Sequence, residues 1–143
     1  MSAEETKAVA RRINDEVWNQ GNLDVIDELI ADDAVISIVG APQEIRGPAG
    51  FREFVTMYRT AFPDLRITVD EQIGEGDVVV NRWTATGTHE GDLMGIAATG
   101  KQATTAGINI NRISGGKLVQ GWGIFDQLGL LQQIGAISVP ARV

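Results

Sequence analysis

The chain has 143 residues, of which 43 % are hydrophobic and 22 % are charged, and its formal net charge is −7. The length and composition are typical of one soluble globular domain, residues 1–143, and the acidic charge argues against nucleic acid and anionic membranes as partners. The sequence has no cysteine and a single histidine, so it excludes disulfides, a thiolate nucleophile and a His-rich metal site. No apolar run reaches the roughly 18 residues of a membrane span, and the acidic first residues do not resemble a signal peptide, so we expect a cytoplasmic protein.

The N-terminal third predicts two helices and a buried strand. Ser2 and Glu5 form a capping-box pattern in front of an amphipathic helix that ends at residues 20–22. A second, shorter helix follows from Leu23 and is expected to stop at residues 32–33. The apolar run at residues 34–39 predicts a strand.

The remaining chain predicts one more long helix, a series of strands and a closing helix. Gly47 and Pro48 open the long helix, since proline suits the first helical position, and Pro63 ends it. Alternating apolar residues and glycine turns then predict strands at residues 65–70, 78–88, 101–113 and 117–125, with a Gly-rich loop at 89–100.

Helices first and long antiparallel strands afterwards are typical of the α+β class. We predict a cone-shaped fold in which a curved, mainly antiparallel sheet is roofed by the N-terminal helices. A short C-terminal helix closes it, with Asp126 as its N-cap and Gly135 as its stop. A curved sheet roofed in this way encloses a cavity.

The strand at residues 117–125 carries the feature that suggests a ligand pocket. Gly121, Gly123 and Phe125 lie on one face of this strand because side chains alternate. Two glycines on one face leave space beneath the closing helix, so we expect Gly121, Gly123 and Phe125 to bind substrate.

Asn109 is the main polar candidate for contact with a ligand in this pocket. If residues 114–116 form a three-residue loop, Asn109 pairs with Gly121; a two-residue loop sets it opposite Trp122 instead. In the first register Asn109 is an amide in an apolar hollow, able to donate to a carbonyl or an enolate. The alternative is that it only satisfies a neighbouring side chain.

A series of short motifs resembles the SnoaL-like polyketide cyclases of the nuclear transport factor two-like superfamily. The motifs are Val17-Trp18-Asn19-Gln20-Gly21-Asn22-Leu23, Phe62-Pro63-Asp64-Leu65, Arg82-Trp83-Thr84 with Gly87-Thr88-His89, Gly107-Ile108, Gly116-Lys117-Leu118-Val119 and the final Leu128-Gly129-Leu130-Leu131-Gln132-Gln133-Ile134-Gly135. The resemblance covers nearly the whole chain in order and spacing. It is specific for the family and less so for the reaction, because this fold hosts many chemistries.

The resemblance implies a homodimer that associates through the sheet, an apolar pocket for a small polyketide-like substrate, no cofactor and no metal. The family's founding members close a ring by aldol condensation, using a pocket aspartate as acid/base and a histidine on the neighbouring strand. The matching positions in this sequence are Gly123 and Asn109. Neither role can therefore be carried over.

Other polar candidates have simpler interpretations. Asp126 is expected to cap the last helix, whereas Asp33 and Asp92 could each reach a pocket entrance. His89 follows a strand in the family's Gly-Thr-His pattern, where a structural hydrogen bond competes with a catalytic role. Among the aromatic residues, Trp18, Tyr58 and Trp83 are expected to line the pocket together with Phe125.

Three functions follow from these patterns. The first is a cofactor-free cyclase of antibiotic biosynthesis that closes a ring by confinement and hydrogen bonding, for example a cycloaddition, because the acid/base pair is absent. The second is cofactor-independent hydroxylation or epoxide opening, for which Arg82 is a possible arginine. The third is a non-catalytic carrier of apolar ligands.

Overall fold

The N-terminal helix begins at the predicted capping box. In the computed structural model, which describes residues 2–138, α1 spans Ala3–Arg12, and the Ser2 hydroxyl accepts a hydrogen bond from the Glu5 backbone N–H at 3.1 Å. The predicted single helix is wrong beyond this point, because η1 (Ile13–Asn19) is a π-helix. Its wider turn brings Asn14 and Asn19, five residues apart, to the same backbone carbonyl of Ile67, at 3.1 and 2.9 Å.

The second predicted helix is shorter than expected. A 3-10 turn, η2 (Leu23–Val25), leads into α2 (Ile26–Leu29), and β1 (Ile30–Ile38) begins at once rather than at residue 34. Ile30 is fully buried and pairs with Leu118, so sheet pairing overrides the helical pattern.

The later elements largely follow the sequence. A short strand that the sequence did not predict, β2 (Ile45–Arg46), precedes α3 (Gly47–Ala61). The predicted strands correspond to β3 (Arg66–Glu75), β4 (Val78–Thr88), β5 (Gln102–Ser114) and β6 (Lys117–Phe125), with β3 longer than predicted. The last helix, α4 (Gln127–Gln133), has the predicted cap, because the Asp126 carboxylate accepts from the Gly129 N–H at 2.8 Å.

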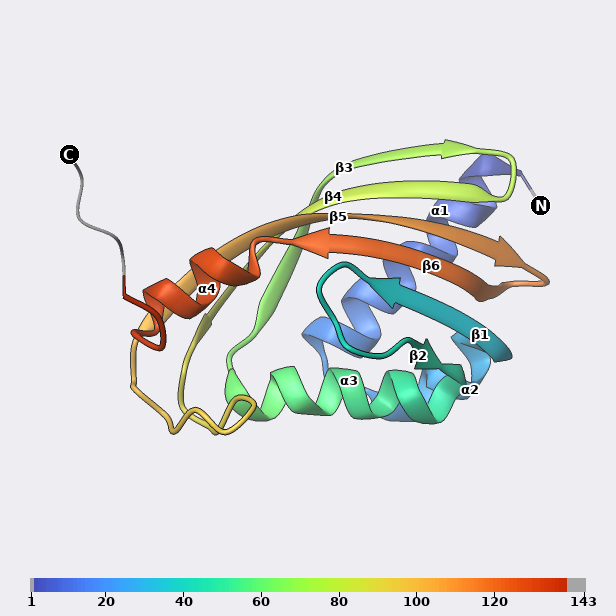
Figure 1. The fold of residues 1–143 in the computed structure, drawn as a ribbon. Helices are drawn as coiled ribbons and strands as arrows, with labels where there is room; N and C mark the ends of the chain where they lie inside the picture. Colours follow the sequence, from blue (N-terminus) through green and yellow to red (C-terminus); the bar gives the residue numbers. More distant parts are fainter. Residues whose placement is uncertain (1, 139–143) are drawn as a thin grey trace.

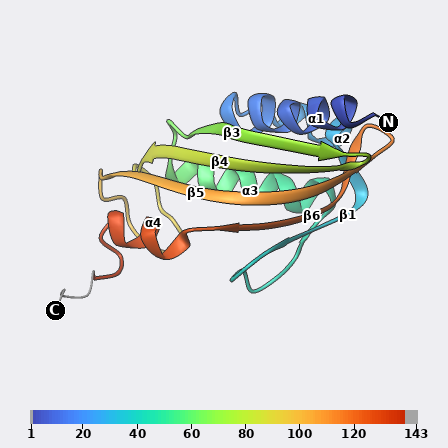
Figure 2. The same ribbon diagram turned by 90° about the horizontal axis from the view of Figure 1, so that it is seen from above.

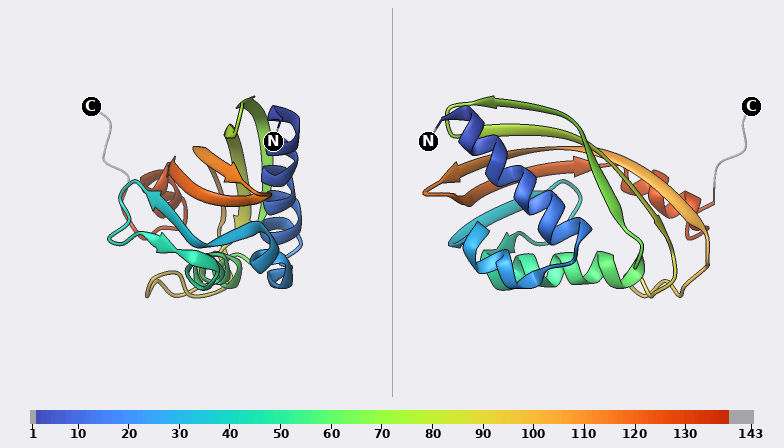
Figure 3. Two further views of the ribbon diagram at one scale, coloured as in Figure 1. Left: turned by 90° about the vertical axis from the view of Figure 1, so that its right-hand side faces the viewer. Right: turned by 180° about the vertical axis from the view of Figure 1, so that it is seen from behind.

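These strands form one sheet in the order β2-β1-β6-β5-β4-β3, in which only β1 and β6 run parallel. The long strands bend over α3, and α1 runs along the same concave side near β3 (Figure 1, Figure 2). Seen from behind and from the side, α1, η1 and α3 cover this face, while the opposite face carries no helix (Figure 3). The predicted α+β cone is confirmed. None of the helices in residues 2–138 has the length and apolar character needed to span a bilayer.

Two β-bulges set which side chains face the concave side. Ser114 pairs with Lys117, so the β5–β6 turn has two residues, yet Asn109 pairs with Gly123 rather than Trp122. The difference is one extra residue, Val119, which stands unpaired where the register shifts. Neither predicted register is therefore right. A second shift at Asp70 of β3 turns Gln72 toward the concave face.

Candidate functional site

A cavity of about 170 Å³ lies between the concave face of the sheet and the helices that cover it. Its wall is mostly apolar and comes from α1, η1, α3 and all the long strands. Residues that line it include Asn14, Trp18, Ile36, Ile38, Phe54, Tyr58, Phe62, Asn81, Trp83, Thr86, Thr105, Asn109, Asn111, Gly123 and Phe125. Ile108, Trp122 and Ile124 also border it, although their side chains belong to the exposed patch described below. An apolar hollow with a few polar groups is the usual form of a small-molecule site.

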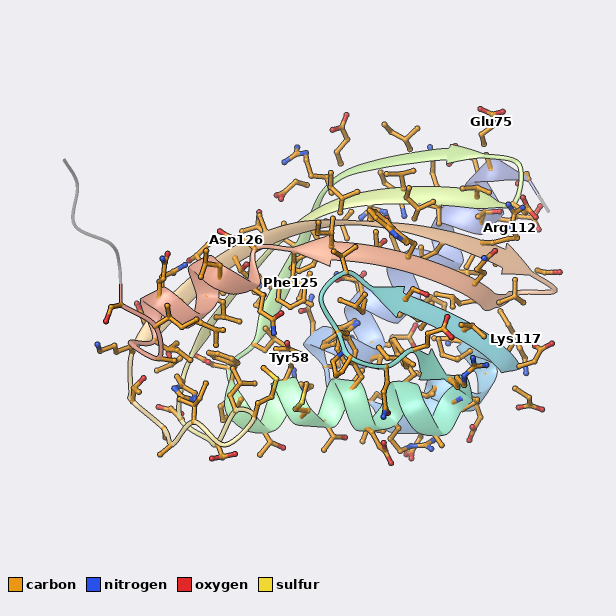
Figure 4. All side chains as sticks on the ribbon, in the orientation of Figure 1. Tyr58, Glu75, Arg112, Lys117, Phe125 and Asp126 are labelled. Atoms are coloured by element: carbon orange, nitrogen blue, oxygen red, sulfur yellow. The ribbon has the colours of Figure 1, made fainter. Side chains whose placement is uncertain are left out.

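Aromatic rings form a continuous wall on one side of the cavity. Trp18 of η1 packs edge-on against Phe54 of α3 at 5.6 Å between ring centroids, and Phe54 packs against Tyr58 at 5.3 Å. Tyr58 then meets Phe125 of β6 at 6.2 Å, and Phe125 lies 6.0 Å from Trp83 of β4. Figure 4 shows Tyr58 and Phe125 approaching each other between α3 and the end of β6. Such edge-to-face contacts hold the rings in fixed orientations around a ligand.

Gly107, which the sequence analysis named only as part of a family motif, makes room for this wall. Gly107 of β5 pairs with both Trp83 and Phe125. A Cβ at residue 107 would lie 2.8 Å from the Phe125 Cβ and even closer to the Trp83 ring. Only glycine therefore lets the indole lie across β5. The signal available in the sequence is a glycine in the middle of a long strand.

The two glycines of β6 have different roles. Gly123 lines the cavity, and the three atoms nearest to a Cβ there would be Ile38 Cδ1 at 3.3 Å and Asn109 Cβ and the Ile108 carbonyl oxygen, each at 3.7 Å. Gly121 is outside the lining, since a Cβ there would lie 2.9 Å from Asn111 Oδ1 and 3.2 Å from the Ile36 side chain. The space beside Gly121 is thus filled by neighbours, whereas a Cβ at Gly123 would be accommodated by a shift of a few tenths of an ångström in the Ile38 side chain.

A row of amide side chains crosses the sheet at the Gly123 end of the cavity. Asn81 of β4 donates to Asn109 Oδ1 at 2.8 Å, and Asn111 donates to the same oxygen at 3.1 Å. Asn109 Oδ1 therefore accepts twice, whereas its Nδ2 has no hydrogen-bond partner among residues 2–138 and is not sealed from solvent. Asn109 and Asn111 are two apart on one strand, a spacing from which Asn111 could have been predicted to share the face.

The lining has almost no capacity for proton transfer. Among the described residues that line the cavity there is no Asp, Glu, His, Lys or Arg. Tyr58 is the one residue with an ionisable side chain in this set, and burial raises the pKa of its hydroxyl. The phenol is thus neutral near pH 7 and can donate a hydrogen bond, but it is a poor base.

The other polar candidates lie outside the lining. His89 is fully buried in the loop after β4, where its Nδ1 accepts from the Thr99 N–H at 3.3 Å and its ring lies 5.5 Å from that of Phe62. The same Nδ1 lies 3.0 Å from the Thr99 hydroxyl, and Nε2 is buried with no hydrogen-bond partner in the described chain. Asp92 accepts from the Gly95 N–H in the same loop, and Asp33 is exposed on β1.

Arg82, the arginine considered for epoxide opening, faces the other side of the sheet. Its guanidinium lies 3.4 Å from Glu71 and 3.8 Å from Asp70, and its side chain is half exposed. The arrangement is a surface ion-pair cluster on the convex face, which removes Arg82 from the cavity.

The convex face carries an exposed apolar patch on β5 and β6, formed by Ile108, Ile110, Trp122 and Ile124. These four are each 41 to 43 % exposed, and they pair across the strands as Ile108 with Ile124 and Ile110 with Trp122. They alternate with Asn109 and Gly123, so their side chains point away from the amide row.

Comparisons with known proteins agree with this architecture. The family model described as SnoaL-like polyketide cyclase matches residues 8–134. The aklanonic acid methyl ester cyclase DauD of Streptomyces sp. (strain C5) is 32 % identical over 126 residues, which are 84 % of this chain and 76 % of the relative.

Two solved structures show the same fold. A proposed polyketide cyclase from Acidithiobacillus ferrooxidans superposes with a TM-score of 0.80 at 34 % identity, covering 91 % of this chain and 94 % of its own. AclR, a proposed hydroxylase from Streptomyces galilaeus, superposes with a TM-score of 0.85 at 28 % identity, covering 99 % and 87 %.

Proposed function

Because the chain belongs to the SnoaL-like polyketide cyclase family, we propose that its cavity closes a ring in a polyketide-like small molecule without a cofactor. The finer part of this proposal is the mechanism. Confinement of a flexible chain, with a hydrogen bond from Asn109 to one carbonyl, takes the place of acid/base catalysis.

The observation that carries the proposal is the combination of an amide donor and a lining without a base. Asn109 Nδ2 is unpartnered in the described chain, whereas the carboxylates, the imidazole and the cationic groups of residues 2–138 lie outside the lining. The resemblance to the family places an aspartate at Gly123, and the three atoms nearest to a Cβ at Gly123 belong to Ile38, Asn109 and Ile108 rather than to a substitute carboxylate.

Confinement can supply much of the rate enhancement. Holding the two reacting ends of one chain in contact removes about 7–11 kcal/mol of barrier in well-oriented systems. One preorganised donor to a developing negative oxygen contributes about 3–4 kcal/mol more. A cycloaddition needs only these two effects, because a hydrogen bond to a conjugated carbonyl draws electron density from the reacting double bond.

The experiment uses a linear polyene that carries a conjugated ketone, with cyclised product quantified over time. The wild-type protein should increase the rate of cyclisation. Asn109→Ala should bind the polyene roughly 2- to 10-fold more weakly, the range of one neutral hydrogen bond. With the polyene saturating, it should also react at least about tenfold more slowly, a loss of about 1.4 kcal/mol of transition-state stabilisation. Gln102→Ala on the exposed start of β5 is the matched control and should react like wild type. No increase with wild-type protein would contradict the proposal.

A hydroxylase is the second candidate, favoured by the similarity to AclR over nearly the whole chain. Incorporation of labelled oxygen from O₂ into product, with no ring formed, would support it. Tight binding of the polyene with no product of either kind, unchanged in Asn109→Ala, would instead indicate a non-catalytic carrier.

The quaternary structure is a further part of the proposal. The convex patch of Ile108, Ile110, Trp122 and Ile124 is larger than isolated surface apolar residues would give, and such patches usually mark an interface. We infer that a second copy of this chain covers it, in line with the homodimer that the family resemblance implies. A role in antibiotic biosynthesis stays an expectation from that resemblance, and a cytoplasmic location stays an expectation from the sequence.

A further inference from the structure

A chain of hydrogen-bonded side chains runs from the surface of α1 to the cavity. The Arg11 guanidinium donates to Gln72 Oε1 at 3.1 Å, and Gln72 Nε2 donates both to the Lys7 backbone carbonyl and to Asn81 Oδ1, each at 3.1 Å. Asn81 Nδ2 in turn donates to Asn109 Oδ1 at 2.8 Å. Along this chain, Gln72 and Asn81 each donate through nitrogen to the oxygen of the next amide toward the cavity.

The direction of this chain is set at its outer end, at Gln72. An amide can usually be turned by 180° with little cost, because its oxygen and its nitrogen have similar shapes. Gln72 cannot, because a guanidinium can only donate and a backbone carbonyl can only accept. Turning the amide would place its nitrogen against Arg11 and its oxygen against the Lys7 carbonyl, losing two hydrogen bonds at once.

The orientation of the Gln72 amide then determines the amide orientations of Asn81 and Asn109. Asn81 is buried and must present its oxygen to Gln72 Nε2, so its nitrogen faces Asn109. Asn109 must present its oxygen to that nitrogen, and Asn111 adds a second donor to the same oxygen. The nitrogen of Asn109 is consequently the atom left for the cavity. A buried amide turned by 180° would place donor against donor or acceptor against acceptor. Each group left without a hydrogen bond in this way lowers the stability by about 1–3 kcal/mol.

We propose that Gln72 is a positioning residue that acts through Asn81 to hold Asn109 as a hydrogen-bond donor, so that the cavity selects ligands presenting an acceptor such as a ketone carbonyl. This inference rests on the proposed function of the cavity as a small-molecule site. The Asp70 bulge is what makes it possible, because without the extra residue Gln72 would point to the convex face.

The test compares two probes of one shape, 2-acetylnaphthalene and 2-isopropenylnaphthalene, which differ by a carbonyl in place of a methylene group. Their Kd values are measured by fluorescence titration for each variant, and the C=O stretch of the bound ketone is recorded by infrared spectroscopy. The Kd ratio cancels general effects of a substitution on cavity shape. The unfolding midpoint of each variant is measured alongside.

Wild-type protein should bind the ketone roughly 2- to 10-fold tighter than the hydrocarbon, the range of one neutral hydrogen bond. Gln72→Glu cannot donate to Asn81, so Asn81 and Asn109 should turn and present an oxygen to the cavity. The ketone preference should then be lost or reversed, and the bound C=O stretch should move to higher wavenumber than in wild type. Gln102→Glu makes the same change at an exposed position of β5 and should behave like wild type.

Three outcomes would overturn part of the reasoning, and they differ from one another. If wild type binds neither probe, the cavity is not a small-molecule site and the proposed function fails as well. If wild type binds both probes equally, Asn109 is not a donor to the ligand. If wild type prefers the ketone and Gln72→Glu keeps the same preference, the positioning role of Gln72 is wrong while the proposed function stands. Should Gln72→Glu fail to fold, Gln72→Met tests the same ratio, because it removes the restraint on direction without adding charge.

Discussion

Substituting Gly123 with aspartate tests the central claim that the cavity has space for a base but contains none. The backbone of Gly123 is outside the left-handed region, so a side chain causes no backbone strain there. The nearest atoms to a new Cβ are Ile38 Cδ1 at 3.3 Å and Asn109 Cβ and the Ile108 carbonyl oxygen, each at 3.7 Å. The carboxylate would enter an apolar space with Asn109 Nδ2 within reach. We expect Gly123→Asp to fold and to gain proton-transfer activity.

The size of the effect follows from burial. Desolvation raises the pKa of a carboxyl group by up to 3–5 units when it is fully buried, and a hydrogen bond from Asn109 lowers it again. A net rise of about 2 units above the unfolded value of about 3.9 would cost about 2.7 kcal/mol of stability once the group is ionised. Because the folded pKa is the higher one, this cost should be absent below about pH 4, grow between about pH 4 and pH 6, and be complete above.

Gly123→Asn is the matched control, since it has the same shape and cannot ionise. The stability difference between the two variants is measured by urea denaturation across this pH range. Proton abstraction is measured as exchange of the methyl protons of 2-acetylnaphthalene in D₂O by NMR, which should be catalysed only by Gly123→Asp and rise toward pH 6. Catalysed exchange by wild-type protein at a comparable rate would refute the reasoning, because a base would then already serve the cavity. A pH-independent stability difference would show that residue 123 does not face a dry space.

Three further predictions concern residues outside the cavity. Trp122→Lys should convert the protein from dimer to monomer, as measured by light scattering, because it places a charge in the convex patch; an unchanged mass would contradict the proposed interface. Gly121→Ala should lower the free energy of unfolding by about 1–3 kcal/mol, since the new methyl group would overlap Asn111; an unchanged urea midpoint would mean that this asparagine moves freely. The Asp64 carboxylate accepts hydrogen bonds from the Thr88 N–H at 2.7 Å and from the Thr88 hydroxyl at 2.8 Å, and these bonds lower the pKa of the Asp64 carboxyl. Because the folded pKa is the lower one, the contribution of Asp64 to stability is present above the unfolded pKa and is lost as the pH falls through the folded pKa. Asp64→Asn should accordingly flatten the acid side of the stability profile, and a profile identical to wild type would argue against that hydrogen bond.

Local patterns in the sequence were sufficient for most elements and for the class of the fold. The capping box at Ser2, the cap at Asp126 and the alternation along residues 78–88 and 117–125 each depend on interactions between near neighbours in the chain. Such interactions are present whatever the rest of the fold does, so they can be predicted without it. The strand residues Trp83, Asn109 and Phe125 could also be predicted to line the cavity, because the face on which a strand residue lies follows from simple alternation.

What the sequence alone determined is therefore a curved sheet roofed by helices around an apolar hollow, with an amide rather than an acid/base pair beside it. The tertiary structure decided the rest: that Asn109 faces Gly123, that Gly121 is filled by its neighbours, and that Gln72 points inward. Each of these depends on a single extra residue, at Val119 or Asp70, or on a side chain from another strand. A β-bulge reverses every later side chain of its strand, yet its position is set by pairing with distant strands, which no local pattern encodes.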